Sequence, residues 1–251
     1  MIANNPFSLE GKIILVAGAS SGIGQRTALE CSKFGAQLIL TARNKERLEQ
    51  TAAALEGIGH HYIDADLTKQ GDIEKIVKAA PPLDGVVLSA GIGFTKPFAF
   101  CTRAMFDEVF DINFFAPVEL LRLLLKGKKL KKGASIVFVS SVGGISEFNV
   151  GNSIYGASKG ALNSIMKQCA LELAQKKIRV NSVNPGMVKT KLIHDGMSIT
   201  EEQLAEDEKR YPMKRYGDPE DVSRGIIYLL SDAASWITGH PLVIDGGLSL
   251  V

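Results

Sequence analysis

The stretch KIILVAGASSGIG, residues 12–24, joins an apolar run to a glycine-rich turn, and the helix-forming sequence that starts in it continues to Gly35. An apolar run without alternation is typical of a strand that is buried on both faces. A glycine-rich turn between a strand and a helix gathers free backbone amides at the positive end of the helix dipole, which suits a pyrophosphate group. The stretch therefore predicts the first strand, turn and helix of a dinucleotide-binding unit.

The three glycines of this turn have separate expected uses. Gly18 permits a tight turn, Gly22 lets the backbone approach a ligand, and Gly24 lets the helix pack close to the sheet. Their spacing, G-x-x-x-G-x-G, differs from the common dinucleotide fingerprint. The prediction therefore depends on the strand before the turn and the helix after it. A plain strand–helix turn without a ligand is the alternative.

The same alternation of short apolar strands and helical segments continues along the chain. We therefore predict the α/β fold class, with a single doubly wound, Rossmann-like parallel sheet and helices on both faces. One domain is expected over residues 1–251, with a substrate lid at about residues 187–217, and Pro117 is expected to bend the long helix. The expected strands are residues 12–18, 36–42, 60–67, 83–91, 134–141, 178–186 and 241–247, and the expected helices are residues 23–35, 44–57, 70–80, 103–127, 153–176 and 218–232.

Composition and charge exclude several classes of protein. The 251 residues are 45% hydrophobic and 22% charged, with a net charge of +2, which gives no reason to expect nucleic acid as a partner. The most apolar helical segment, residues 117–130, carries charges at Glu119, Arg122 and Lys126, so no membrane span is expected. Residues 1–12 have no pattern of a secretion signal, and a cytoplasmic protein is expected.

Cysteine and histidine spacing predicts neither disulfides nor a metal site. The cysteines lack CxxC spacing, and the histidines form no HExxH or similar ligand pattern, so we expect reduced thiols and no metal. These residues are Cys31, Cys101, Cys169, His60, His61, His194 and His240.

The tip of the second strand bears on the choice of dinucleotide. A carboxylate there would bind the ribose 2′-hydroxyl of NAD, but the chain has Ala42 followed by Arg43. An arginine at this position suits a 2′-phosphate, with Ser20 of the glycine turn as a second donor. We therefore predict NADPH/NADP+ as the cofactor, while Arg43 as a solvated surface residue leaves NAD(H) open.

The stretch SIYGASKGAL, residues 153–162, sets Tyr155 and Lys159 one helical turn apart on the same face. A free tyrosine titrates near pH ~10, and a nearby cation favours the phenolate and lowers its pKa. The pair is therefore either a device for moving a proton or an ordinary surface pair of a half-exposed helix. The small residues around the pair are expected to let the helix approach a cofactor closely.

Seven motifs together resemble the short-chain dehydrogenase/reductase family, in the order in which that family has them and over nearly the whole chain. The oxoacyl-carrier-protein reductases are the most similar branch in length and ending. The motifs are AGASSGIG (17–24), LSAG (88–91), FDINFFAP (110–117), VSS (139–141), YGASK (155–159), NPGMVKT (184–190) and WITGHPLVIDGG (236–247).

The resemblance implies a catalytic set. Tyr155 would be the general acid in reduction and the general base in oxidation, and Lys159 would also bind the ribose hydroxyls of the nicotinamide nucleoside. Ser141 would donate a hydrogen bond to the substrate oxygen. Asn113 would hold a water that connects Lys159 to solvent.

The resemblance also implies a cofactor set. Asp66 would bind the adenine amino group, Ala90 and Gly91 would line the ribose, and Val188 and Thr190 would fix the nicotinamide carboxamide. This chain departs from the family pattern at Ser21, where many members that use NADP have a basic residue. The full predicted set is Gly18, Ser20, Ser21, Gly22, Ile23, Gly24, Arg43, Asp66, Leu67, Ala90, Gly91, Tyr155, Lys159, Pro185, Gly186, Val188 and Thr190.

The expected function is an NADP(H)-dependent oxidoreductase that interconverts a carbonyl and a secondary alcohol, with a 3-oxoacyl thioester as one candidate substrate. The alternatives are an NAD(P)-dependent dehydrogenase of a sugar, a steroid or another small alcohol, an epimerase or dehydratase on the same fold, and a non-catalytic nucleotide-sensing protein. The apolar lid residues suggest a partly apolar pocket. They are Met187, Ile193, Met197, Tyr211 and Met213.

Two further partners remain open. The lysine-rich run at residues 126–133, with Lys176 and Lys177, is either a docking site for an acidic acyl carrier protein or a solvated helix end. By analogy with the family, a homotetramer or homodimer is expected, with the Tyr155 helix at the interface. Its residues Ile165, Cys169 and Leu173 are expected to face the partner subunit.

Overall fold

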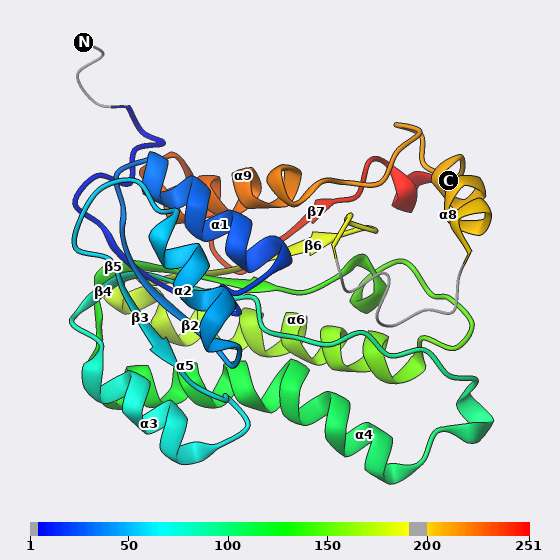
Figure 1. The fold of residues 1–251 in the computed structure, drawn as a ribbon, viewed down its shortest axis with the longest axis horizontal. Coiled ribbons are helices and arrows are strands. Elements are labelled where there is room, and N and C mark those ends of the chain that lie inside the picture. Colours follow the sequence, from blue (N-terminus) through cyan, green and yellow to red (C-terminus); the bar gives the residue numbers. More distant parts are fainter. Residues whose placement is uncertain (1–4, 191–199) are drawn as a thin grey trace.

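The computed structural model describes residues 5–190 and 200–251, and Figure 1 shows their fold. The described strands form one parallel sheet with the order β3-β2-β1-β4-β5-β6-β7. The predicted α/β fold with a doubly wound sheet is therefore confirmed. The strands are β1 (Ile13–Ala17), β2 (Gln37–Ala42), β3 (His61–Asp64), β4 (Leu83–Leu88), β5 (Leu130–Val139), β6 (Arg179–Pro185) and β7 (Pro241–Ile244).

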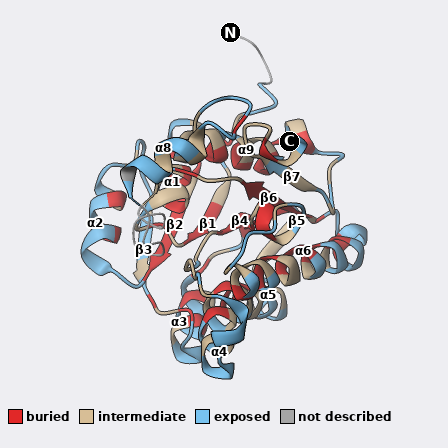
Figure 2. Ribbon diagram, turned by 90° about the vertical axis from the view of Figure 1, so that its right-hand side faces the viewer, coloured by how far each residue is buried: buried red, intermediate tan, exposed pale blue. Residues whose placement is uncertain are grey.

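Helices cover both faces of the sheet. In Figure 1, α3, α4, α5 and α6 lie on one face and α1, α2 and α9 on the other. Each face has its own apolar core, and Figure 2 shows buried residues along the strands and on the inner sides of the helices. The helices are α1 (Gly22–Lys33), α2 (Lys45–Ala53), α3 (Gln70–Ala79), α4 (Arg103–Phe110), α5 (Ala116–Lys126), α6 (Ser153–Leu173), α8 (Glu201–Glu208) and α9 (Pro219–Leu230).

The order of the strands fixes where a ligand can bind. β1 lies between β2 and β4, and the chain proceeds outward from this central pair in both directions. In such sheets the loops after β1 and β4 diverge to opposite faces and leave a crevice at the carboxyl ends of the strands. Ala17 and Leu88 are paired in register at this point, so the glycine turn and the LSAG motif lie side by side.

The predicted long helix of residues 103–127 is divided. A π-helical turn at Asp111–Phe115 separates α4 from α5, and Pro117 lies in the first turn of α5. The break is therefore centred before the proline that was expected to bend the helix. Pro117 has no N–H to donate to the carbonyl of Asn113 four residues earlier, which favours the wider turn at this place.

The structure corrects the prediction about the outer face of α6. Leu173 is buried in the core of its own chain, and Ile165 and Cys169 pack against the same core. Leu171 is a large apolar residue of α6 whose side chain is exposed, at 76%. The prediction is therefore wrong for Leu173, whose side chain packs in the core, whereas Ile165 and Cys169 are only partly buried and the interface stays a prediction.

In the described part of the chain, no helix is long and apolar enough to cross a membrane.

Candidate active site

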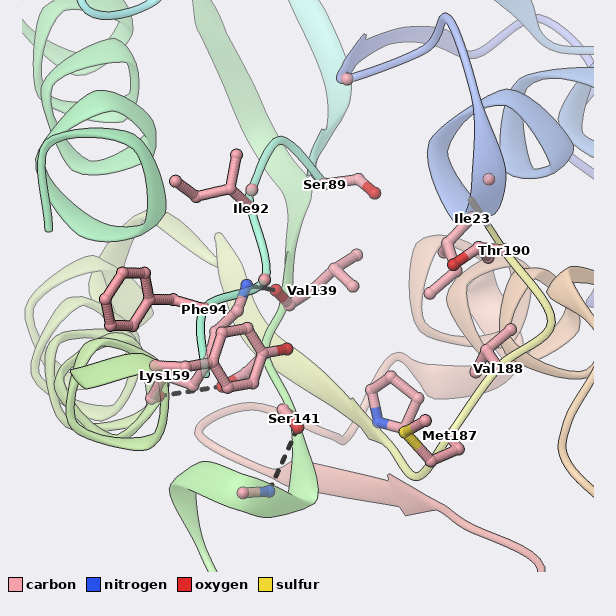
Figure 3. Close-up of a pocket in the computed structure, with 18 of the residues that line it drawn as sticks. Ile23, Ser89, Ile92, Phe94, Val139, Ser141, Lys159, Met187, Val188 and Thr190 are labelled. Atoms are coloured by element: carbon pink, nitrogen blue, oxygen red, sulfur yellow. Dashed lines mark hydrogen bonds between the residues drawn. The ribbon is translucent and has the colours of Figure 1, made fainter. Parts of the chain in front are cut away.

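A cavity of about 1290 Å³ extends along the carboxyl ends of the strands. It is larger than the roughly 300–1,000 Å³ that is usual for a ligand pocket, so a dinucleotide and a second molecule have room together. In Figure 3, Ile23, Val188 and Thr190 lie across the cavity from Ile92, Phe94 and Lys159. Apart from Gly24 and Asn113, all predicted catalytic and cofactor residues line it.

The glycine turn is shaped by its glycines. Gly18 and Gly22 have φ angles of +84° and +55°, which favour glycine. A Cβ atom on Gly18 would lie 2.7 Å from the Ala90 amide nitrogen, and one on Gly24 would overlap the Gly18 carbonyl. Gly24 therefore acts as predicted, by letting α1 approach β1. The first-turn amides of α1 are left free, and the residues present fit a dinucleotide.

Two arginines line the cavity beside the glycine turn. Arg43 follows β2 and Arg47 lies in the first turn of α2, and both side chains are exposed. The Arg47 amide donates to the Asn44 side chain at 2.9 Å, which caps α2 and holds the Arg47 main chain in the first turn of the helix. Helical side chains lean toward the helix N-terminus, so Arg47 leans toward Arg43. The sequence analysis missed Arg47, although its spacing of four residues from Arg43 was a usable signal.

Asp66 occupies the rim near these arginines as an ionised group. Burial pushes its pKa upward, but hydrogen bonds from the amide and hydroxyl of Thr68, at 3.1 and 2.8 Å, outweigh this effect. The charges of Arg43 and Lys69 act in the same direction, so the pKa of Asp66 is held below its usual value. A carboxylate at this place can accept a hydrogen bond from an exocyclic amino group.

Lys159 is buried, and its charge is costly there. The residue is 5% exposed, and its Nζ donates to the Val139 carbonyl at 3.0 Å. Burial lowers the pKa of Lys159 to about 8. A Cβ atom on Gly91 would lie 3.3 Å from Nζ, so the glycine leaves the space that the ammonium occupies.

Tyr155 lies beside both Lys159 and Ser141. The Lys159 Nζ is 5.7 Å from the centre of the Tyr155 ring, a cation–π distance. Burial raises the pKa of Tyr155, and hydrogen bonding with the Ser141 hydroxyl opposes this rise. The expected lowering by Lys159 is therefore not seen in the ligand-free chain. The reason is that Nζ faces the ring and the Val139 carbonyl and is not hydrogen-bonded to the phenol oxygen.

The small residues around Tyr155 have a use that differs from the expected one. A Cβ atom on Gly156 would lie 2.7 Å from the Gly143 carbonyl, and one on Gly144 would lie 2.6 Å from the Gly160 amide nitrogen. They admit the 3₁₀ turn Val142–Gly144 that follows β5, and an approach to a cofactor stays a prediction. Because Ser141 precedes this turn and accepts from the Gly143 amide at 3.1 Å, the close packing sets Ser141 against α6.

Asn113 braces the loop after β4 with its side chain. Its Oδ1 accepts from the Ile92 amide at 2.8 Å, and its Nδ2 donates to the Ile92 carbonyl at 3.0 Å and to Ser158 at 3.2 Å. The side chain is fully buried and does not line the cavity. A water held by Asn113 would therefore bind to its main-chain carbonyl, which lies in the π-helical turn.

The end of β6 forms the other wall of the cavity. Pro185, Gly186, Val188 and Thr190 all line it. Val188 forms an isolated parallel bridge with Gly217, which ties this segment to the chain that leads into α9. A Cβ atom on Gly22 would lie 3.3 Å from Thr190 Cγ2, so the two walls meet at the glycine turn.

The structure adds side chains that sequence reasoning missed. One group of lining side chains comes from the segment after Ser141 and is polar. A second group comes from α8 and from the segment that follows α8. Both groups line the open end of the cavity. No contiguous motif marks them, because they belong to three separate segments. They are Glu147, Asn149, Asn152, Gln203, Leu204, Asp207, Arg210 and Tyr216. Of the predicted lid residues, Ile193 and Met197 lie outside the described residues, whereas Met187 and Tyr211 line the cavity.

Comparison with known proteins agrees with this arrangement. A family model described as enoyl-(acyl carrier protein) reductase matches residues 18–249. The chain belongs to the short-chain dehydrogenase/reductase family. It is an oxidoreductase of this family, whose members use NAD(P)(H).

Relatives of the family with different substrates are similarly close. The chain is 33% identical to a 3-oxoacyl-acyl-carrier-protein reductase of Rickettsia felis, over 97% of this chain and 99% of that protein. It is also 33% identical to an L-xylulose reductase of Caenorhabditis elegans, over 99% of both chains. The structure of a Pseudomonas aeruginosa RhlG/NADP active-site complex superposes with a TM-score of 0.90 at 29% identity, covering 98% of this chain and 99% of that one.

Proposed function

We propose that this short-chain dehydrogenase/reductase is an NADP(H)-dependent reductase that interconverts a carbonyl and a secondary alcohol, with 3-oxoacyl thioesters as its substrates. The observation that carries the proposal is the meeting of Ser141, Tyr155 and Lys159 at one wall of the cavity, opposite the end of β6. The glycine turn provides for the dinucleotide, and the space beyond it provides for the substrate.

The proposed roles follow from what each group can do. The bound dinucleotide supplies the hydride. The Tyr155 hydroxyl donates a proton to the substrate oxygen, because it carries a transferable proton beside the Ser141 hydroxyl at this wall of the cavity. The Ser141 hydroxyl donates a hydrogen bond to the same oxygen as negative charge develops on it. Lys159, when protonated, donates to the ribose hydroxyls and favours the phenolate that Tyr155 becomes.

Replacement of the proton is assigned to Asn113. Its main-chain carbonyl receives no hydrogen bond from residue 117, because that residue is a proline. The Asn113 side chain and Lys159 Nζ both approach the Cβ position of Gly91, at 3.1 and 3.3 Å, so the turn that carries this carbonyl lies close to Lys159. The proposed route runs from solvent through a water on this carbonyl and Lys159 to Tyr155.

The preference for NADP(H) is supported by the two cavity arginines. Arg43 and Arg47 make no ion pair within the described residues, and both line the part of the cavity beyond Ser20 and Ser21. A 2′-phosphate carries about two negative charges, which two guanidinium groups can bind through several N–H donors. Arg47 thereby supplies the positive charge that many NADP-using members of the family have at the position of Ser21. The NADP complex of the structural neighbour is consistent with this assignment.

The central test is Tyr155→Phe. The ring packing stays, whereas the transferable proton is lost, so NADPH binding is expected to persist and turnover to fall by at least 100-fold. NADPH affinity by calorimetry and turnover on a panel of carbonyl compounds measure the two effects separately. Unchanged turnover of the variant would contradict the proposal. Binding of NADPH without turnover of any carbonyl by the natural chain would favour a nucleotide-sensing protein.

The thioester substrate rests on the similar carrier-protein reductases, and the lysine-rich run limits how a carrier docks. The run Lys126–Lys132 leads into β5 and includes its first residues, so it lies at the amino ends of the strands. The cavity lies at the carboxyl ends, roughly 30 Å away along β5 at a rise of ~3.3 Å per residue. Lys129 donates to the Ala80 carbonyl and Lys131 pairs with Asp84, both at 2.7 Å, which leaves Lys126, Lys128 and Lys132 exposed. A carrier docked there would deliver its substrate to the cavity of another copy of the chain, in the proposed homodimer or homotetramer.

The carrier proposal has a direct rate test. A 3-oxoacyl group on acyl carrier protein should be reduced at least tenfold faster than the same group on a short free thioester, because docking raises the local concentration of the substrate. Charge reversal at Lys132 should lower the first rate and leave the second unchanged. Equal rates with both substrates would contradict docking.

The polar side chains at the open end of the cavity favour a second candidate, a reductase of sugars or other hydroxylated compounds. Glu147, Asn149 and Asn152 offer acceptors and donors to hydroxyl groups. The similar L-xylulose reductase is consistent with this candidate. A kcat/KM for ketose sugars above that for 3-oxoacyl thioesters would decide for it.

A further inference from the structure

Tyr211 is buried under the loop that follows β6. It is 1% exposed, and one edge of its ring packs against two glycines. A Cβ atom on Gly186 would lie 3.3 Å from Cε1 of the ring, and one on Gly246 would lie 3.5 Å from Cδ1. Gly186 directly follows β6 and Gly246 follows β7, so the ring packs against the ends of both strands. The residue comes from the segment after α8, outside every motif that the sequence offered.

The hydroxyl of Tyr211 binds the main chain at the cavity wall. The Met187 amide donates to it at 3.0 Å. On its other side the same segment is bound by Gly217, whose amide donates to the Met187 carbonyl at 2.9 Å and whose carbonyl accepts from the Lys189 amide at 2.8 Å. Met187–Lys189 is therefore held between a phenol and a second main-chain segment. Val188 and Thr190, which this hold positions, line the cavity together with Met187.

We propose that Tyr211 is a positioning residue for hydride transfer, because its hydroxyl fixes the Met187 amide and thereby the depth at which Val188 and Thr190 hold the nicotinamide carboxamide. The inference rests on the proposed function. Without the hydroxyl, the Met187 amide loses its acceptor and the segment moves to find another, since an unpaired amide away from water is unfavourable. The shift would be felt at the nicotinamide and not at the adenine, which binds at the far end of the cavity.

Tyr216 provides a matched control. It is 3% exposed and packs edge-to-face on Tyr211, with the ring centres 5.3 Å apart. Its hydroxyl donates to Asp207 at 2.9 Å and lies 3.2 Å from the Leu204 carbonyl, so it binds α8 and not the Met187 segment. Phenylalanine at either position keeps the aromatic packing and removes one buried phenol oxygen. A purely structural role of Tyr211 would therefore give similar results in the two variants.

The experiment compares Tyr211→Phe and Tyr216→Phe in the full chain. Affinity is measured by calorimetry for whichever of NADPH and NADH binds more tightly, and for the matching adenine fragment, 2′,5′-ADP or 5′-ADP. Single-turnover hydride transfer is followed by nicotinamide absorbance. For Tyr211→Phe we expect dinucleotide affinity and the transfer rate to fall about tenfold each, as for a lost buried hydrogen bond, with fragment affinity unchanged. Tyr216→Phe should leave the ratio of dinucleotide affinity to fragment affinity within twofold of that of the natural chain.

A second measurement reports the segment directly. Hydrogen exchange of the Met187 amide in the absence of cofactor should be faster in Tyr211→Phe and unchanged in Tyr216→Phe. Equal affinity ratios, rates and amide protection in the two variants would overturn the role of Tyr211 and leave the proposed function intact. If the natural chain bound no dinucleotide, the proposed function and this inference would both be overturned.

Discussion

The two walls of the cavity are held in place by different means. The glycine turn is held by main-chain contacts: the Gly18 and Ala19 amides donate to the Thr41 carbonyl at 2.9 and 3.2 Å, and the Ser89 amide donates to Ala17 at 3.0 Å. The wall after β6 has main-chain bonds to Gly217 on one side, but side chains hold its other side, through the Tyr211 hydroxyl and an ion pair of Lys189 with Glu208 at 3.1 Å. The turn should therefore tolerate most side-chain changes except at its glycines, whereas the second wall can be adjusted by single side chains.

The largest effect is expected from Gly24→Ala, which tests the main-chain wall. The added Cβ would overlap the Gly18 carbonyl, and neither backbone can move without displacing β1 or α1. Overpacking of this kind costs about 1–3 kcal/mol, and the displaced turn should also lose dinucleotide binding. The free energy of unfolding by denaturant titration and NADPH affinity are the measurements.

Gly71→Ala is the control for this variant, because nothing lies within 4 Å of its Cβ position in α3. It should stabilise the chain slightly or leave it unchanged, since alanine favours a helix over glycine. A Gly24→Ala protein with the stability and cofactor affinity of the natural chain would show that the close approach of α1 to β1 is not required.

The next effect concerns chemistry and not binding. Ser141→Ala removes the donor to the developing oxyanion, which should lower kcat about 10²–10³-fold with NADPH affinity unchanged. Ser140→Ala is the matched control, because the Ser140 hydroxyl donates instead to the Lys159 carbonyl at 2.9 Å and belongs to a buried network with Asn163. It should lower stability more than kcat. The opposite pattern would mean that Ser140 is the residue that contacts the substrate.

The comparison of the two walls also explains what the sequence could and could not predict. The glycine turn is a contiguous motif whose contribution lies in its backbone, so Gly18, Gly22 and Gly24 could be given separate expected uses once the strand before the turn and the helix after it were recognised. Tyr155 and Lys159 were recognisable because a helix fixes their separation. The second wall combines β6, the segment after α8 and the β7 end, and its side-chain contacts depend on tertiary packing. Tyr211 was therefore read as an apolar lid residue, while its hydrogen bond to Met187 had no sequence signal.

The sequence also predicted the surroundings of Asn113 only in part. The motif placed it in a helix before Pro117, and the structure has it in a π-helical turn with its side chain committed to Ile92. Spacing alone does not reveal such a turn, because a π turn and an α turn use the same residue types. The orientation of the Lys159 ammonium toward the Val139 carbonyl was equally beyond reach, since it depends on the strand packed beneath α6.

A smaller effect is expected at the adenine end, where charge and not backbone shape sets selectivity. Arg47→Gln should lower the ratio of NADPH to NADH affinity by roughly tenfold, as for a lost charge-assisted hydrogen bond. Lys45→Gln removes the same charge from the same helix, but Lys45 does not line the cavity and lies 3.8 Å from Glu49. Its ratio should stay within twofold. Equal changes in the two variants would reduce the role of Arg47 to general electrostatic attraction.

The smallest effect at neutral pH is expected from the titration of Lys159, which lines the cavity and is proposed to bind the cofactor. Burial lowers its pKa in the free protein to about 8 from a model-compound value of 10.5, so the ligand-free protein begins to lose this proton near pH 8. Ribose hydroxyls that accept from the ammonium favour the protonated form, which raises the pKa in the complex. Affinity for NADPH should therefore be constant below about pH 7.5 and fall by up to tenfold per pH unit above 8. In Lys159→Met the affinity should be weak and independent of pH over the same range. A natural chain whose NADPH affinity is flat from pH 7 to 9.5 would mean that the ammonium does not contact the cofactor, and the proton route through Lys159 would lose its support.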